Sequence, residues 1–211
     1  MIKNCKGILD LFLQDYKGEN LVAVDMTLGN GNDLRKLVDI LGNESKFYGF
    51  DIQDISIKNT KEKFNEKELS NINLILDSHE YIDKYVKENI DISVYNLGYL
   101  PKGDKKIVTN YKKVINSLEV LLEKLNPNGR VFITFYPGHP SGLEEAIHIE
   151  KYLKELNQKE FEIIKFDFMN QRNNPPFLIT LEKIKWKKLL LLVAVLLEWW
   201  LPLQQKMKII M

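Results

Sequence analysis

Residues 21–31, LVAVDMTLGNG, join a short apolar run to a loop that contains Gly29 and Gly31. Such a run before a glycine loop is typical of a buried strand that leads into the first βα turn of a doubly wound sheet. Glycine has no Cβ, so the chain can turn sharply at these positions and its backbone can approach a ligand closely. We therefore expect the first turn to form part of a ligand site.

The rest of the chain alternates between strand-like and helix-like patterns. Further strands are predicted at 46–51, 72–76, 91–95 and 131–136, and helices at 8–16, 33–41, 54–68, 111–125 and 143–156. Two last strands, 161–168 and 177–182, have no helix between them and should pair antiparallel. Residues 1–184 are thus predicted to form one α/β domain: a seven-stranded, mostly parallel sheet with an antiparallel last strand and helices on both faces.

Composition narrows the class of protein. Hydrophobic residues make up 45% and charged residues 28% of the 211 residues, which is an ordinary globular composition. The formal net charge is +1, so a nucleic acid would have to be held by a local basic patch. The single cysteine, Cys5, and the scattered His79, His139 and His148 predict neither a disulfide nor a metal site. The first residues lack the apolar core of a signal peptide, so we expect a cytoplasmic protein.

The C-terminal segment 185–211 is unusually apolar. Residues 189–197 form an unbroken apolar run, followed by Glu198, Trp199 and Trp200. A bilayer-spanning helix needs about 20 residues, so we expect no transmembrane span. A docking helix, an interfacial segment and a tail that is not native to the fold all remain open. We favour a tail that is covered by protein, either by its own domain or by a second copy in a homodimer.

Three aspartates stand at the ends of successive predicted strands: Asp25, Asp51 and Asp77. Asp51 lies 20 residues after Gly31, where a carboxylate can accept hydrogen bonds from both hydroxyls of a ribose. Asp25 would repel a pyrophosphate, but it suits the ammonium group of S-adenosylmethionine. The turn at Asp77 would meet the adenine amine. The expected cofactor-binding set is Asp25, Thr27, Gly29, Asn30, Gly31, Asp33, Asp51, Gln53, Asp77, Ser78 and His79.

The stretch NLGYLP at 96–101 follows the fourth predicted strand. The side-chain oxygen of Asn96 and a nearby carbonyl can accept hydrogen bonds from an amine, which aims the nitrogen lone pair at a methyl donor. The ring of Tyr99 can stack on a base that has left its helix. A plain turn after a strand would explain the same residues structurally.

Other polar groups are expected at the same edge of the sheet. An aliphatic amine must lose a proton before it attacks, and Tyr99, Asp104 and His139 are the candidates to assist. The residues leave the choice among them open, and His139 could instead be an ordinary loop histidine. Phosphate contacts are expected from Lys102, Lys105, Lys106 and Arg172, although solvated loops have similar composition.

These stretches resemble the family of rRNA methylases, which are class I S-adenosylmethionine-dependent methyltransferases. The resemblance runs from about Leu21 to Lys183, through 25–33, 48–53, 95–105, 136–140 and 168–178. It implies a Rossmann-like class I fold and methylation of 5-aminomethyl-2-thiouridine, at the wobble position in the anticodon loop of tRNA, to the 5-methylaminomethyl form. The stretch 96–99 is similar to the Asn-Pro-Pro-Tyr signature of amino methyltransferases, with both prolines replaced. The chain departs from the family at its short N-terminal region, at Leu28 and Leu34, and after Ile184.

Three other functions are compatible with parts of the sequence. A small-molecule N-methyltransferase would need an enclosed pocket in place of an open basic face. A non-catalytic RNA-binding or membrane-associated protein could keep the fold without binding the cofactor. A dinucleotide-dependent oxidoreductase is disfavoured by Asp25 and by the absence of a third glycine at the dinucleotide spacing.

Overall fold

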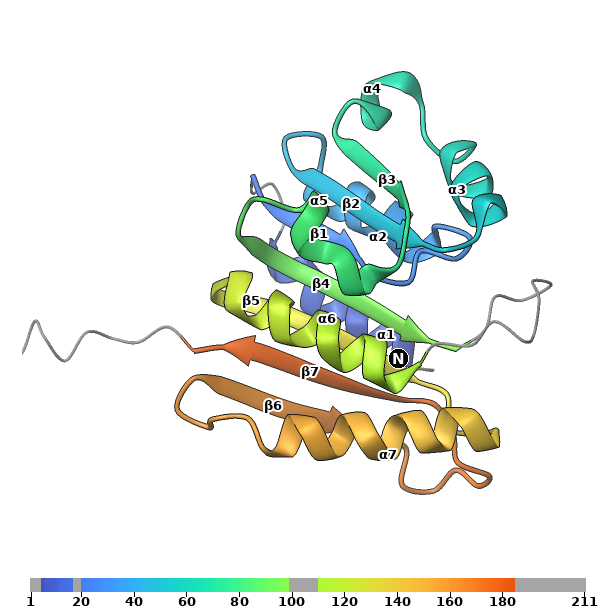
Figure 1. Cartoon of the computed structure of the whole chain (residues 1–211), viewed down its shortest axis with the longest axis vertical. Helices are drawn as coiled ribbons and strands as arrows, with labels where there is room; N and C mark the ends of the chain where they lie inside the picture. The colour runs from blue at the N-terminus through green and yellow to red at the C-terminus, as the bar shows by residue number, and fades with distance from the viewer. Residues whose placement is uncertain (1–4, 17–19, 99–109, 185–211) are drawn as a thin grey trace, which may run out of the picture.

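The computed structural model describes residues 5–16, 20–98 and 110–184. Seven strands form one sheet in the order β3-β2-β1-β4-β5-β7-β6 (Figure 1). Among the described strands, β7 alone runs opposite to the others, and it pairs antiparallel with both of its neighbours, β5 and β6. This arrangement confirms the predicted class I fold with its antiparallel last strand. The strands are β1 (Val22–Asp25), β2 (Lys46–Asp51), β3 (Ile72–Leu76), β4 (Ile90–Leu97), β5 (Leu125–Phe135), β6 (Phe161–Phe166) and β7 (Phe177–Lys183).

Helices cover both faces of the sheet, as predicted (Figure 1). On one face, α1 and α2 bury their apolar side chains against Ala23, Phe47 and Phe132. On the other face, α5, α6 and α7 pack against Val24, Tyr95 and Ile133. Successive side chains of a strand point to opposite faces, so one sheet supports two cores. The helical elements are α1 (Cys5–Leu13), η1 (Gln14–Tyr16), α2 (Asn32–Leu41), α3 (Asp54–Lys61), α4 (Glu66–Leu69), η2 (His79–Tyr81), α5 (Ile82–Tyr85), α6 (Tyr111–Lys124) and α7 (Pro140–Lys154).

The prediction of one polar helix over residues 54–68 is wrong. It is divided into α3 and α4, because Asn65 begins a new helix. The Asn65 side chain accepts a hydrogen bond from the Glu68 backbone, and the Glu68 carboxylate accepts one from the Asn65 backbone. This capping box satisfies backbone donors that a continuous helix would have used internally.

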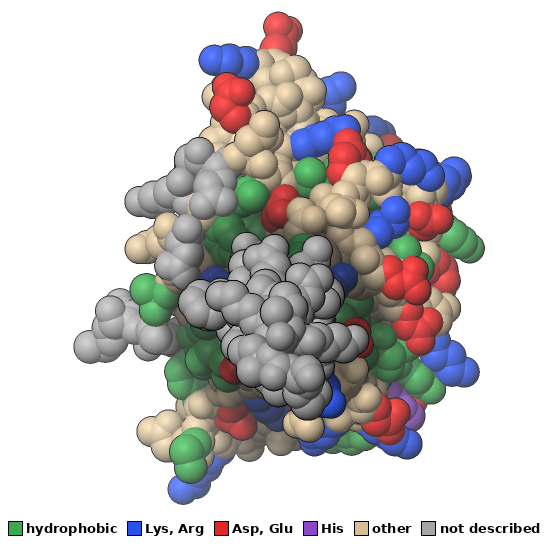
Figure 2. Space-filling model, turned by 90° about the vertical axis from the view of Figure 1, so that its left-hand side faces the viewer, with side chains coloured by type: hydrophobic (Ala, Val, Ile, Leu, Met, Phe, Trp, Pro, Cys, Tyr) green, Lys and Arg blue, Asp and Glu red, His purple; other side chains and the backbone are tan. Residues whose placement is uncertain are grey.

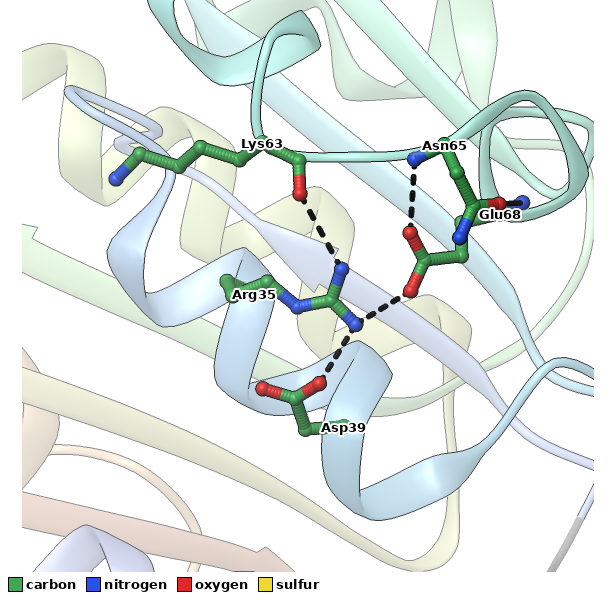
Figure 3. Close-up of polar contacts among 5 residues, drawn as sticks. All are labelled: Arg35, Asp39, Lys63, Asn65 and Glu68. Atoms are coloured by element: carbon green, nitrogen blue, oxygen red, sulfur yellow. Dashed lines mark hydrogen bonds and ion pairs between the residues drawn. The ribbon is translucent and has the colours of Figure 1, made fainter.

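Arg35 ties this region to the rest of the domain (Figure 3). Its guanidinium contacts Asp39 at 2.6 Å and Glu68 at 2.7 Å, and it also donates to the Lys63 carbonyl at 3.5 Å. It lies over the ring of Phe64 as well, 4.6 Å from the centroid. A single side chain of α2 therefore holds the segment between α3 and α4.

Other boundaries differ from the prediction at the strand ends. β4 continues to Leu97, so Asn96 lies within the strand and not after it. β5 begins at Leu125 and includes Asn128, whose φ of 66° is left-handed. The two helical turns over 79–85 were not predicted, because seven residues are too few for a helical period to appear.

At the amino-terminal edge of the sheet, basic and acidic side chains are interspersed (Figure 2). Lys46, at the start of β2, pairs there with Glu88.

Among the described helices, none has the length and apolar character that a bilayer crossing requires. The tail predicted at 185–211 lies outside the described residues.

Candidate functional site

The glycine loop follows β1 at the carboxyl edge of the sheet. Its backbone is fixed by neighbouring strands: the Met26 N–H donates to the Val94 carbonyl at 2.9 Å, and the Leu28 N–H donates to the Phe50 carbonyl at 2.9 Å. Gly29 and Gly31 have φ of 53° and 67°, in the left-handed region that favours glycine. A Cβ on Gly31 would lie 2.6 Å from the Thr60 side chain, so the loop is packed closely on α3.

Asp51 closes this loop from the end of β2. Its Oδ2 accepts from the Gly29 N–H at 2.8 Å, and its Oδ1 accepts from the Gln53 N–H at 2.8 Å. A carboxylate has about four acceptor positions, so both oxygens retain capacity for a ligand hydroxyl. Ile52 beside it is 57% exposed, although its type would favour burial. Ile52 is not among the predicted site residues, and its place directly after a strand-end aspartate is the signal that the sequence offers for it.

Asp25 is almost completely buried, with 1% of its surface exposed. Its Oδ1 accepts from the Thr27 N–H at 3.1 Å, whereas its Oδ2 has no hydrogen-bond partner among the described residues. Burial raises the pKa of this carboxyl well above its usual range, and the charges of Asp33 and Asp51 raise it further. We refer to Asp25, Asp33 and Asp51 as the acidic cluster.

The glycine loop holds the backbone of Asn96, and α2 holds its side chain. Its backbone N–H donates to Thr27 Oγ1 at 2.7 Å, and its side-chain Nδ2 donates to Asp33 Oδ2 at 2.9 Å. These contacts bring the predicted acceptor residue to two members of the predicted cofactor set. The side-chain oxygen of Asn96 is left as a hydrogen-bond acceptor.

The turn after β3 contains three further predicted residues. Asp77 accepts from the Ser78 N–H at 2.8 Å and from the Tyr85 hydroxyl at 2.7 Å. The Tyr85 hydrogen bond lowers the pKa of Asp77. Burial lowers the pKa of His79 to about 4, and its ring meets Tyr95 edge-on with centroids 6.0 Å apart. Recognition of the adenine by Asp77 stays a prediction. One of its carboxylate oxygens already accepts a hydrogen bond from Tyr85.

His139 begins α7 as its N-cap. Its Nδ1 accepts from the Gly142 N–H at 3.0 Å, which satisfies one of the free donors at the start of the helix. The ring therefore has a structural role that the sequence did not indicate.

The remaining predicted residues lie elsewhere. Asn30 accepts a hydrogen bond from the Asn59 side chain at 3.2 Å, and Arg172 is exposed between β6 and β7. The predicted residues Tyr99, Lys102, Asp104, Lys105 and Lys106 lie outside the described residues.

A separate cavity of about 550 Å³ lies between α7 and the β6–β7 connection. Its wall combines Leu143 and Ile147 with charged groups such as Glu150 and Lys165, which are paired at 2.8 Å. No member of the acidic cluster lines it. The candidate site is therefore formed by the polar side chains at the strand ends and lies apart from this cavity.

The acidic cluster fits the cofactor expected from the sequence. Asp25 Oδ2 and Asp33 Oδ1 are both buried without a hydrogen-bond partner among the described residues. A buried carboxylate is costly unless a cation or a donor compensates it. S-adenosylmethionine carries an ammonium and a sulfonium, and no phosphate that this cluster would repel. Asp25 and Asp33 would hold its cationic part, and Asp51 its ribose.

Comparisons with known proteins find similar methyltransferases. A family described as "Putative rRNA methylase" matches residues 47–182. A "putative rRNA-methylase" structure from Clostridium thermocellum is 37% identical with a TM-score of 0.83, and the match covers 87% of this chain and 100% of that one. A "putative methyltransferase" from Streptococcus mutans in complex with SAH is 36% identical with a TM-score of 0.78, at the same coverage.

A curated relative is the chloroplastic tRNA (mnm(5)s(2)U34)-methyltransferase of Arabidopsis thaliana. It is 32% identical over 166 residues, which are 74% of this chain. The chain spans 60% of the length of that relative.

Proposed function

This chain belongs to the rRNA methylase family and is an S-adenosylmethionine-dependent methyltransferase (EC 2.1.1), and from that premise we propose that its acceptor is a modified wobble uridine of tRNA. The proposed reaction converts 5-aminomethyl-2-thiouridine to its 5-methylaminomethyl form. The expected cofactor is confirmed by the related structure in complex with SAH. The acceptor is supported by the curated relative, whose name describes the product of this reaction.

The observation that carries the proposal is the geometry of Asn96. Its Nδ2 is engaged by Asp33, so its Oδ1 is the group that can accept a hydrogen bond from an amine. A neutral primary amine has two N–H donors and one lone pair. If the amine donates a hydrogen to Asn96, its lone pair can be directed away from that contact and toward the methyl donor.

The bound cofactor supplies an electrophilic methyl group, and the protein supplies position and electrostatics. The Asp33 carboxylate lies beside Asn96 near the end of β4, and Asp25 and Asp51 lie close enough to Asp33 to form one cluster with it. The proton that leaves the amine is assigned to no single residue. His139 Nδ1 already accepts from Gly142, which disfavours it as the base relative to Tyr99 and Asp104.

The RNA contacts follow from charge. The formal net charge of +1 gives no general attraction to a polyanion, so phosphates would be held by local cations. Arg172 is exposed, and we propose that it acts together with Lys102, Lys105 and Lys106. Tyr99 would stack on the uridine, a contribution of about 1–3 kcal/mol.

Mass analysis of nucleosides from tRNA tests the proposed acceptor. Cells without this protein should accumulate 5-aminomethyl-2-thiouridine and lose the 5-methylaminomethyl form. The wild-type gene should restore the product, and a gene for Asn96→Ala should not. Unchanged wobble nucleosides in cells without the protein, together with methylation of a small amine by the purified enzyme, would replace the tRNA assignment by a small-molecule one.

A further inference from the structure

We infer that Asp33 is a positioning residue, which acts on the acceptor amine through Asn96. The inference rests on the proposed function for its chemical purpose, but the contact itself does not depend on the substrate. The two residues are 63 positions apart in the chain, and their side chains meet at 2.9 Å. From the sequence alone, Asp33 is predicted only as a residue that binds the cofactor.

An asparagine amide has nearly the same shape in two orientations, which exchange its oxygen and its nitrogen. An ionised carboxylate can only accept hydrogen bonds, so Asp33 favours the orientation in which Nδ2 faces it. The opposite orientation would bring the oxygen of Asn96 against an oxygen of Asp33. Asp33 thereby selects the orientation that leaves Oδ1 of Asn96 for the acceptor amine.

The surroundings keep both partners in place. The Asn96 backbone donates to Thr27 Oγ1 at 2.7 Å, which ties this end of β4 to the glycine loop that leads into α2. Asp33 lies in the first turn of α2, where the partial positive charge of a helix N-terminus favours a carboxylate. Gly31, the N-cap of α2, contributes no side chain to that end of the helix.

Without Asp33, the amide of Asn96 can rotate and present its NH₂ group to the amine. Two donors would then face each other, and the lone pair would lose its direction. One hydrogen bond that involves a charged group corresponds to roughly a tenfold to hundredfold effect on a rate. We expect a loss of kcat in this range for Asp33→Ala.

The control is Asp33→Asn. Its side chain has the same shape and can still offer an oxygen to Asn96 Nδ2, although it has no charge. Both variants lose the charge that would hold the cationic part of the cofactor, so kcat is compared at saturating cofactor. If Asp33 works by positioning, Asp33→Asn should then lose less kcat than Asp33→Ala. Removal of one carboxylate from the acidic cluster reduces repulsion between like charges, so both variants should fold.

A double-mutant cycle on tRNA methylation tests the route of action. The variants are Asp33→Ala, Asn96→Ala and the pair, each with its affinity for S-adenosylhomocysteine measured by calorimetry. A residue that acts through Asn96 should add no further loss of kcat once Asn96 is alanine. Equal losses of kcat in both backgrounds, with the same drop in cofactor affinity for Asp33→Ala and Asp33→Asn, would assign Asp33 to the cofactor alone and overturn the inference.

An NMR measurement decides the contact without any substrate. The side-chain amide signal of Asn96 is the one missing from the spectrum of Asn96→Ala. It should shift and exchange faster with water in Asp33→Ala, and change much less in Asp33→Asn. An unchanged signal in Asp33→Ala would overturn the inference. If this signal responds as expected while the wild-type enzyme fails to methylate tRNA, the proposed substrate is wrong and the positioning contact stands.

Discussion

The carboxylate of Asp51, at the end of β2, accepts a hydrogen bond from the backbone N–H of Gly29 at 2.8 Å. The two residues are 22 positions apart, and the contact fixes the glycine loop over the carboxyl edge of the sheet. Gly29 has a φ of 53°, so the loop is held in a backbone conformation that few other residues adopt. Asp51 therefore shapes the site in addition to any contact with a ribose.

Asp51→Ala should strongly weaken cofactor binding without unfolding the protein. The variant loses both the predicted ribose acceptor and the hydrogen bonds to Gly29 and Gln53. Each bond to a charged group contributes about 1.5–3 kcal/mol, so the affinity for S-adenosylmethionine should fall at least about tenfold. Calorimetry measures the affinity, and Asp83→Ala, which removes an exposed carboxylate paired with Lys124, is the control. Unchanged affinity would remove Asp51 from the site.

Gly31→Ala should destabilise the fold through a side-chain clash that Gly42→Ala does not create. Both glycines have positive φ, 67° and 76°, so each substitution also introduces backbone strain of about 1–3 kcal/mol of unfolding free energy, and Gly42, with a ψ of 175°, lies in a region that is nearly exclusive to glycine. At Gly42 a Cβ has no neighbour within 4 Å, whereas at Gly31 it would lie 2.6 Å from the Thr60 side chain. Urea denaturation should show that Thr60→Ala recovers part of the loss in Gly31→Ala and none in Gly42→Ala. Equal behaviour in the two backgrounds would contradict the close packing of the loop on α3.

His139→Ala should lower the unfolding free energy by about 0.5–2 kcal/mol, because the N-cap of α7 is lost. Asn is a good N-cap residue, so His139→Asn should recover much of that stability. If the histidine serves α7 alone, His139→Asn should methylate its substrate at the wild-type rate. A fall in kcat in both variants, despite restored stability in His139→Asn, would instead assign a proton-transfer role to His139.

His79 should make the protein less stable in mild acid. Burial lowers its pKa to about 4 in the folded state, against an ordinary value of 6.5. At pH values between these two, the unfolded chain binds more protons than the folded protein does. The contribution of His79 to the unfolding free energy is therefore fully present above pH 6.5 and is lost as the pH falls toward 4. The shift corresponds to about 3 kcal/mol. The charges of Glu80 and Lys113 act on the ring in opposite directions.

His79→Phe isolates this effect, since a phenyl ring can keep the edge-on contact with Tyr95 and cannot take a proton. Urea denaturation between pH 4.5 and 8 should give a flatter profile for the variant below pH 6.5. Above pH 6.5, the difference between variant and wild type should be constant. Parallel profiles over the whole range would show that another group causes the acid sensitivity.

The amino-acid sequence by itself determined the order of elements and the type of fold. The strands at 46–51 and 72–76 were predicted with the bounds that the structure has. This succeeded because apolar periodicity is a local property, and a residue's neighbours in the chain are enough to show it. The missing helix between the last two strands similarly required β7 to run antiparallel. The glycines and strand-end aspartates could be located for the same reason.

Only the tertiary structure decided which of these side chains meet. Asp33 and Asn96 were assigned to separate tasks, yet the register of β1 beside β4 and the start of α2 bring them to 2.9 Å. His139 was considered for proton transfer, and the fold uses its ring as a helix cap. Hydrogen bonds act over about 3 Å, so they depend on sheet register and side-chain rotamers. These are settled by the packing of the whole domain, which a local pattern of residue types does not contain.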